Sequence, residues 1–195
     1  MQTISEELQI YEQNINKSKF IAYACYTNSV DSANKIILDI SKKNADAKHI
    51  VFAYVIEPNI VKKENSTEPT NTAGTPILTA IQKKKLTNTL VVVVRYFGGV
   101  LLGTGGLYRA YSTSAVNVLE QCTIRDIRKF YKFSVKLDYS QLSQIEKIDP
   151  QKILIFDKQY GESVGLILAV ETLEVVDFLS KEIELQQPSV EEIWV

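Results

Sequence analysis

The residues best suited to chemistry lie in one glycine-rich segment, residues 90–111, which reads LVVVVRYFGGVLLGTGGLYRAY. Most of the eight glycines of the chain are here, namely Gly98, Gly99, Gly103, Gly105 and Gly106. Glycine permits positive φ angles and the close approach of a ligand or backbone, and free amides at a helix N-terminus attract anions. Arg95 and Arg109 add guanidinium groups that match phosphate or carboxylate. We expect an anion-binding loop, with tight turns and close packing as the alternative use of these glycines.

The glycine spacing differs from the two common phosphate-binding motifs. No Gly-Lys-Ser/Thr follows, as a P-loop requires, and the GxGG spacing is not the GxGxxG of dinucleotide-binding folds. The segment therefore predicts an anion site of another kind, and no cofactor is expected.

A second candidate site lies in the polar segment EPTNTAGTP, which begins at Glu68. Thr72 and Gly74 precede a helix that is predicted to have Thr75 as its N-cap and Pro76 at its first position. The backbone amides at the N-terminus of this helix form a second candidate anion-binding site. Glu68 offers a carboxylate for a metal or for general base catalysis, but a solvated loop carboxylate is the simpler interpretation.

His49 is the only histidine of the chain, and Cys25 and Cys122 are its only cysteines. A histidine at the start of a strand is usually packed or hydrogen-bonded, so His49 is a weak candidate for acid–base catalysis. These three side chains are too few for a zinc site of nitrogen and sulfur ligands, and we expect no metal. The chain has no secretory signal, so both thiols are expected to be reduced.

Hydrophobic patterns predict the elements that must position these residues. Strands are expected over residues 20–26, 49–56 and 89–94. Helices are expected with apolar faces over residues 33–40, 77–81 and 107–122. Ser29 or Asp31 is the expected N-cap of the first helix. The Pro, Asn and Thr content of residues 57–75 predicts a long loop without a regular element.

The pattern changes after residue 130. It predicts a strand, a helix, a hairpin about Gly161, a second helix and a last strand, over residues 130–139, 141–148, 152–160, 164–171, 173–184 and 190–195. This βαββαβ order is the ferredoxin-like plan. We therefore expect an α+β protein of two domains, 1–128 and 129–195, joined near residues 126–129.

The composition is that of an ordinary globular protein, with 195 residues, 45% of them hydrophobic and 23% charged. No apolar run approaches the roughly 20 residues that span a bilayer, and the N-terminus lacks a signal peptide. We expect no membrane association and a cytoplasmic location. The first domain has 15 Lys and Arg against 11 Asp and Glu, and the second has 7 against 12. The positive charge balance of the first domain favours an anionic partner, although a chance imbalance of charges on solvated faces explains the same numbers equally well.

Two longer blocks carry a family resemblance. EPTNTAGTPIL, followed by VVVVRYFGGVLLGTGGLYRAY, closely resembles the signature blocks of the IMPACT/YigZ family, and SKFIAYA and AKHIVFAY resemble its earlier blocks. The resemblance is specific over residues 17–119. It implies a first domain like domain IV of the translocation elongation factor, a ribosomal-protein-like βαβ sandwich, and a ferredoxin-like second domain. For bacterial members it implies nucleic-acid or ribosome association.

The first block departs from the family pattern DDGEPSGTAG. Asn65 and Ser66 stand where the family has two aspartates, and the inner glycines are replaced, while Glu68 remains. A metal site built on paired acids is therefore not expected. In the second block Leu101 replaces a lysine. The residues that match there are Arg95, Tyr96, Phe97, Gly98, Gly99, Gly103, Gly105, Gly106 and Arg109. All of these except Phe97 are the expected ligand- or nucleic-acid-binding residues.

Three functions remain open at this point. The first is a non-catalytic protein that associates with RNA or the ribosome, as a translation regulator like eukaryotic relatives of the family. Those relatives act through an additional domain, so their specific role is not expected to transfer. The second is an enzyme on a small phosphorylated substrate, with Glu68 and His49 as acid–base groups. The third is a protein partner bound at a sheet edge of the second domain.

Overall fold

The computed structural model describes residues 1–195 except 6, 58, 148, 150, 151, 173, 175–190 and 195. The chain divides into two compact units, Met1–Asp126 and Ile127–Val195. In the described residues both units combine α-helical structure with an antiparallel sheet, so the fold is α+β, as predicted. None of the helices in the described ranges is both long and apolar enough to cross a membrane.

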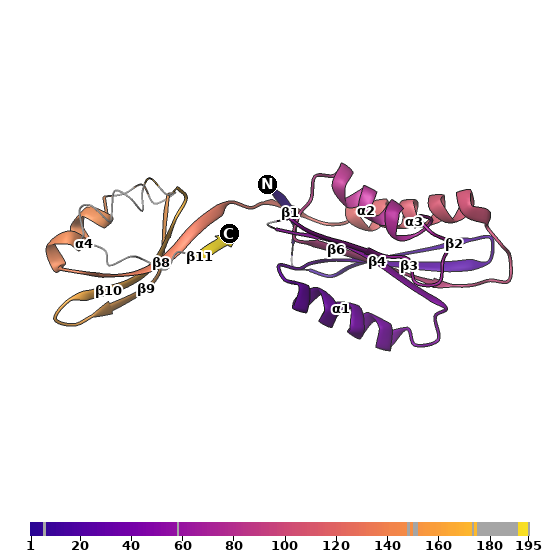
Figure 1. The fold of residues 1–195 in the computed structure, drawn as a ribbon, viewed down its shortest axis with the longest axis horizontal. Coiled ribbons are helices and arrows are strands. Elements are labelled where there is room, and N and C mark those ends of the chain that lie inside the picture. Colours follow the sequence, from indigo (N-terminus) through magenta and orange to yellow (C-terminus); the bar gives the residue numbers. More distant parts are fainter. Residues whose placement is uncertain are drawn as a thin grey trace. The chain divides into compact units, whose positions relative to one another are not determined.

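The first unit is built on a five-stranded antiparallel sheet in the order β2-β3-β6-β4-β5. Its strands are β2 (Gln9–Ile15), β3 (Ser18–Tyr26), β6 (Thr89–Tyr96), β4 (His49–Ile56) and β5 (Ile60–Glu64). Two short strands, β1 (Gln2–Ile4) and β7 (Ile124–Asp126), pair with each other outside this sheet. Figure 1 shows α1 (Val30–Lys43) on one face of the sheet, and α2 (Gly74–Lys83) and α3 (Gly103–Glu120) on the other.

The nearly all-valine strand is the central strand β6, as its sequence predicts. Val91 and Val93 pack into the core beneath α2 and α3, whereas Val92 and Val94 pack into the core beneath α1. Successive side chains of a strand point to opposite faces of the sheet, so a strand covered by helices on both faces is apolar throughout.

Two edge strands lie where the sequence patterns predict none. β5 occupies part of the stretch that was expected to be a loop, and all its residues are exposed. β2 alternates half-buried and exposed residues. The prediction failed for β5 because an edge strand exposed on both faces needs no apolar pattern, and lysines such as Lys62 and Lys63 protect such an edge from further pairing.

The expected start of α2 was also wrong. The helix begins at Gly74, with Ala73 as its N-cap residue, rather than after Thr75. The Gly74 amide donates a hydrogen bond of 2.7 Å to Oδ1 of Asn65, and the Thr75 hydroxyl donates to Asn71. A side chain nine positions upstream therefore caps the helix, a relation that local sequence patterns do not reveal. The α1 cap is confirmed: Ser29 Oγ accepts from the amide of Ser32.

The second unit holds a four-stranded antiparallel sheet in the order β11-β8-β10-β9. Its described elements are β8 (Lys129–Leu137), α4 (Tyr139–Ile145), β9 (Ile153–Tyr160), β10 (Val164–Val170) and β11 (Glu191–Trp194). The hairpin predicted about Gly161 is confirmed by the pairing of β9 with β10. The helix predicted over 173–184 falls almost wholly outside the described residues.

Candidate functional site

The sheet register brings two of the predicted residues side by side. His49 begins β4 and lies opposite Arg95, near the end of β6, while Phe20 of β3 lies opposite Arg95 on its other side. Directly paired residues of neighbouring strands point to the same face. Arg95 therefore follows Val91 and Val93 onto the face that α2 and α3 cover.

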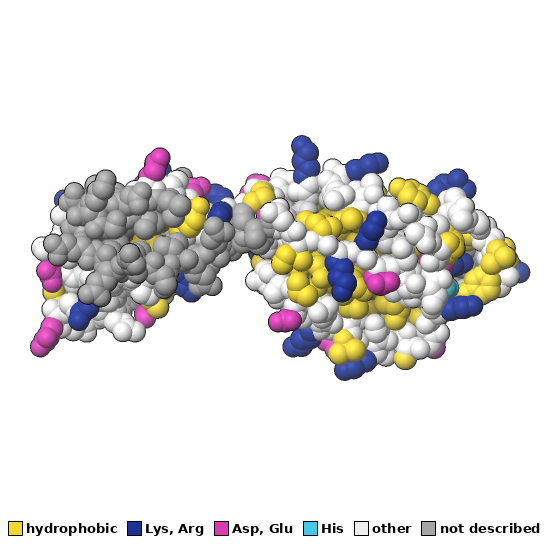
Figure 2. Space-filling model, in the orientation of Figure 1, with side chains coloured by type: hydrophobic (Ala, Val, Ile, Leu, Met, Phe, Trp, Pro, Cys, Tyr) yellow, Lys and Arg dark blue, Asp and Glu magenta, His cyan; other side chains and the backbone are white. Residues whose placement is uncertain are grey.

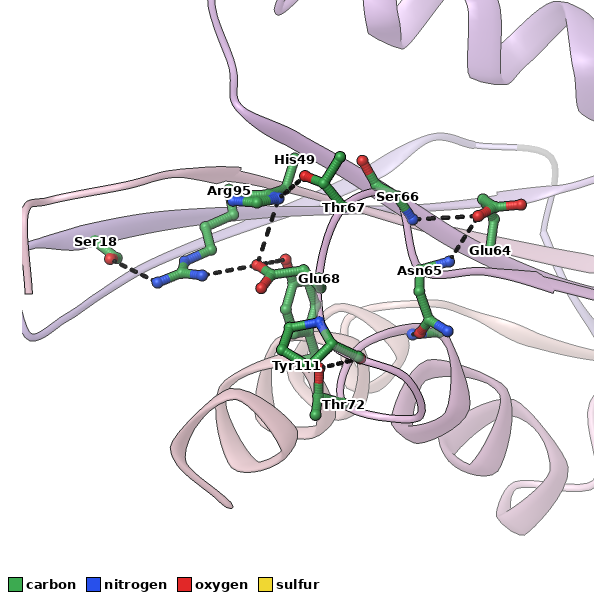
Figure 3. Close-up of polar contacts among 12 residues, drawn as sticks. Ser18, His49, Glu64, Asn65, Ser66, Thr67, Glu68, Thr72, Arg95 and Tyr111 are labelled. Atoms are coloured by element: carbon green, nitrogen blue, oxygen red, sulfur yellow. Dashed lines mark hydrogen bonds and ion pairs between the residues drawn. The ribbon is translucent and has the colours of Figure 1, made fainter. Parts of the chain in front are cut away.

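Glu68 joins Arg95 from the segment between β5 and α2 (Figure 3). Nη1 of Arg95 donates a 2.7 Å hydrogen bond to Oε1 of Glu68, and the Tyr111 hydroxyl donates to the same oxygen at 2.8 Å. The side chains of Glu68 and Arg95 are only 3% and 5% exposed. The expectation of a solvated loop carboxylate was therefore wrong: Glu68 is a buried anion neutralised by a buried cation.

Burial determines the state of the groups around this pair. It raises the pKa of the Tyr111 hydroxyl far above its ordinary value, and the negative charge of Glu68 raises it further. Tyr111 therefore remains a hydrogen-bond donor at any physiological pH. A buried ion pair of this kind is stable only while both partners are present, because either one alone is an uncompensated charge in a medium of low polarity.

His49 stands at the edge of the same network. Its Nδ1 lies 2.9 Å from the Thr67 hydroxyl and 3.8 Å from Oε1 of Glu68. Burial lowers the pKa of His49 below its ordinary value of 6.5; Glu68 opposes this shift, while Arg95 and Lys48 add to it. The imidazole is therefore neutral near pH 7.

The remaining contacts of Arg95 hold the start of the glycine segment. Its Nη2 donates to Oγ of Ser18 at 3.4 Å, and the amide of Gly98 donates to the same oxygen at 3.2 Å. The guanidinium carbon lies 5.4 Å from the ring centre of Phe97. Within the described residues, Nε of Arg95 has no hydrogen-bond partner.

The five glycines of the segment 90–111 occupy different structural environments. A Cβ at Gly98 would lie 1.8 Å from the Lys17 carbonyl oxygen, so this glycine is required by packing. Gly99 and Gly103 have φ angles of +83° and +68°, which favour glycine. Gly103, Gly105 and Gly106 belong to the start of α3 rather than to the loop that the sequence predicts. A Cβ at Gly105 would meet no described atom within 4 Å.

A cavity of about 490 Å³ lies over this network. We call it the His49 cavity; it is lined by Lys48, His49, Thr67, Glu68, Pro69, Arg95, Phe97, Leu101, Leu102, Gly103, Thr104 and Leu107. It combines buried polar groups with apolar walls, as ligand sites commonly do. In the described part of the chain, no side chain caps the N-terminus of α3 at Leu102. The first turn of α3 also contains no acidic residue.

Eight predicted site residues lie outside the lining of this cavity: four glycines of the signature segment, Gly98, Gly99, Gly105 and Gly106, and also Thr72, Gly74, Tyr96 and Arg109. Tyr96 points to the α1 side, where its hydroxyl donates to Asn44. Thr72 donates to the carbonyl of Pro69, and Gly74 packs against the backbone of Glu64. Arg109 is exposed on α3.

Sequence patterns missed several residues that make contacts at this site. Among them, Ser18, Lys48, Thr67, Phe97 and Tyr111 were not proposed as site residues. Tyr111 was assigned to the apolar face of its helix because its spacing is that of a core residue, and its ring is indeed buried against Phe20. Only the tertiary contact with Glu68 shows that its hydroxyl has a polar role.

The replaced acidic residues of the first signature block have a structural explanation. Asn65 keeps an oxygen where an aspartate would have one, and this oxygen caps α2 through Gly74. The amides of Asn65 and Ser66 themselves donate to the carboxylate of Glu64. Among the described residues, no group of three His, Cys, Asp or Glu side chains lies close enough together to hold a metal ion.

Comparisons with known proteins agree on one family. The model described as Impact N-terminal domain matches residues 16–119. The IMPACT family member YvyE of Bacillus subtilis is 34% identical over 171 residues, which cover 86% of this chain and 79% of YvyE. The IMPACT family member YigZ of Escherichia coli is 30% identical over 174 residues, covering 87% and 85%. A crystal structure of a hypothetical protein, 27% identical, has a TM-score of 0.70 and covers 98% of this chain and 95% of that one.

Proposed function

Since the chain belongs to the IMPACT family, we propose that it is a non-catalytic protein that associates with nucleic acid or the ribosome and regulates translation. The observation that carries the proposal is the uncapped N-terminus of α3, which opens onto the His49 cavity beside the exposed Lys48. Amides and dipole at such an end favour the phosphates of a nucleic acid.

Arg109 extends this surface along α3. Gly105 and Arg109 are four residues apart, so they lie on one face of the helix. A helical side chain covers the turn that precedes its own Cα, and Gly105 leaves that turn open. The Arg109 guanidinium therefore has room to extend toward the N-terminus of α3 and to contribute a second cation.

The binding surface is local rather than a broad basic face. On the face that Figure 2 shows, the Lys and Arg side chains of the first unit lie scattered among hydrophobic, acidic and uncharged areas. The net charge of the whole chain is −1. Affinity for nucleic acid then depends on a few phosphate contacts at the α3 terminus and not on general attraction.

The test is the salt dependence of RNA binding. For single-stranded RNA, log affinity declines with log salt concentration. This decline becomes shallower by about 0.7 for each phosphate that the protein no longer neutralises. We expect Lys48→Ala and Arg109→Ala each to reduce this slope. Lys35→Ala is the matched control, because Lys35 is exposed on α1, across the sheet from α3. Equal slopes for all three variants and the parent would refute the proposal.

The position of His49 favours a second candidate, an enzyme acting on a small phosphorylated substrate. Glu68 is held by Arg95 and Tyr111, so it positions its neighbours, while the neutral His49 is the group suited to proton transfer in the cavity. Turnover of a phosphorylated compound that is lost in His49→Gln, with the fold intact, would support this candidate over the first.

For the second unit we infer a ferredoxin-like fold. The antiparallel order β11-β8-β10-β9 places the first and third strands of the unit in the centre, which supports that plan. A protein partner at one of its sheet edges, and a cytoplasmic location of the chain, also remain proposals.

A further inference from the structure

One ring nitrogen of His49 is left for a ligand. The side chain lines the His49 cavity and is only 8% exposed. Its Nδ1 is shared with the Thr67 hydroxyl, whereas Nε2 has no hydrogen-bond partner among the residues that the structure describes. Nε2 is not one of the fully buried polar atoms without a partner, so it is open to the cavity and available to a ligand there.

The N-terminus of α3 lines the same cavity independently of His49. Gly103 and Thr104 are part of the lining, and their amides belong to the four that a helix leaves without an internal partner. Space around the backbone of Gly103 and Gly105 is open, since a Cβ there would meet no described atom within 4 Å. A ligand can therefore reach these amides directly.

The charges in the cavity select an anion. The negative charge of Glu68 is balanced by Arg95 at 2.7 Å, which leaves the positive end of α3 and the exposed Lys48 without a negative partner of their own in the lining. A tetrahedral anion with several acceptor oxygens can accept from donors on both sides of the cavity at once. The apolar walls, which include Leu101, Leu102 and Leu107, suit an organic group attached to it.

From these observations we propose that the His49 cavity binds a phosphate monoester, whose oxygens take hydrogen bonds from the first amides of α3 and from Nε2 of His49, with Lys48 beside them. A monoester has one organic substituent, so its phosphate can reach the amides of α3 while the substituent lies against the apolar walls of the cavity. The proposal rests on the proposed function in one respect, namely that this cavity takes an anion. The monoester is either a free nucleotide-like molecule or the 5′-phosphate end of an RNA.

The single histidine makes the site directly observable. Ring nitrogen NMR of ¹⁵N-labelled protein reports the tautomer and the pKa of His49 without overlap from another histidine. The charged groups that act on this ring are Glu68, Arg95 and Lys48. A phosphate dianion at Nε2 adds a negative charge, so it raises the pKa of His49.

The titration uses inorganic phosphate and a ribonucleoside 5′-monophosphate, in a buffer that contains no other phosphate. We expect both to shift the Nε2 resonance with saturation and to raise the pKa of His49. Thr104→Asp places a carboxylate in the first turn of α3, where it favours the helix but repels a phosphate, and it should weaken binding at least tenfold. Thr113→Asp, an exposed position farther along α3, is the matched control and should leave binding unchanged.

RNA oligonucleotides with a 5′-phosphate or a 5′-hydroxyl separate the two sources of the monoester. Tighter binding of the phosphorylated RNA, with a shift at His49, assigns an RNA end; a shift with the monophosphate and no preference between the RNAs assigns a small molecule. An unchanged His49 ring with every probe overturns this inference, even if RNA binds elsewhere with a salt slope that depends on Arg109. A His49 shift with phosphate in a protein that binds no RNA instead overturns the proposed nucleic-acid association.

Discussion

Arg95 donates a 2.7 Å hydrogen bond to Glu68 in the interior of the first unit, and the two residues are separated by 27 positions in the sequence. The Tyr111 hydroxyl donates a second hydrogen bond to the same carboxylate oxygen of Glu68. This cluster around one buried ion pair thus ties the segment before α2 to the end of β6 and to α3, which line the His49 cavity together with the start of β4.

The first prediction concerns this ion pair. Glu68→Ala leaves the Arg95 guanidinium buried without a counter-charge, and we expect the free energy of unfolding to fall by about 3–5 kcal/mol. The double variant Glu68→Gln with Arg95→Met should recover part of this loss, because it removes both charges. Urea denaturation measures both changes. Glu12→Ala, which breaks the exposed pair with Lys19, is the control and should have a much smaller effect; equal losses for Glu12→Ala and Glu68→Ala would contradict the prediction.

The second prediction separates two glycines of the signature segment. Gly98→Ala introduces a Cβ only 1.8 Å from the Lys17 carbonyl oxygen, and the resulting backbone shift should destabilise the protein by about 1–3 kcal/mol or more. Gly105→Ala enters open space within a helix, where alanine is favoured over glycine by about 0.5–1 kcal/mol. Thermal or urea unfolding should therefore shift in opposite directions for the two variants. A stable Gly98→Ala protein would show that the backbones at Lys17 and Gly98 do not approach as closely as described.

The third prediction concerns the pH dependence of stability through His49. Its pKa is lowered in the folded state, so between the folded value and about 6.5 the unfolded chain binds more protons. The contribution of His49 to stability is therefore fully present above pH 6.5 and is lost as the pH falls from 6.5 toward the folded value. Urea unfolding across this range, in a buffer without phosphate, should show a steeper decline for the parent than for His49→Gln. Parallel curves would contradict a depressed pKa.

The fourth prediction tests the cap of α2. Asn65→Ala removes the oxygen that accepts from the Gly74 amide, which should lower stability by about 1 kcal/mol. Asn65→Asp, which restores the residue typical of the family at this position, keeps an acceptor and adds a negative charge near the positive end of α2. We therefore expect it to match or exceed the parent in the same unfolding experiment. A loss in Asn65→Asp equal to that of Asn65→Ala would exclude the capping role.

The sequence alone determined the elements whose burial repeats with a regular period. The valines of β6 and the apolar face of α3 could be recognised because each residue in such an element is packed according to its position in the repeat. The strand β5 could not, because it joins the sheet through backbone pairing with β4 while its side chains are exposed. The signature residues could likewise be found as a group, but the sequence did not show which contact each of them makes in the fold.

Only the tertiary structure decided how the site is assembled. Glu68 was assigned to solvent because a carboxylate in a polar segment is normally hydrated, and its burial depends on Arg95 and Tyr111, which are 27 and 43 positions away. His49 faces Arg95 only through the register of β4 with β6. The sequence therefore shows which residue types the site contains. The charge balance of the cavity and the open Nε2 of His49 arise from contacts between segments that no local sequence pattern connects.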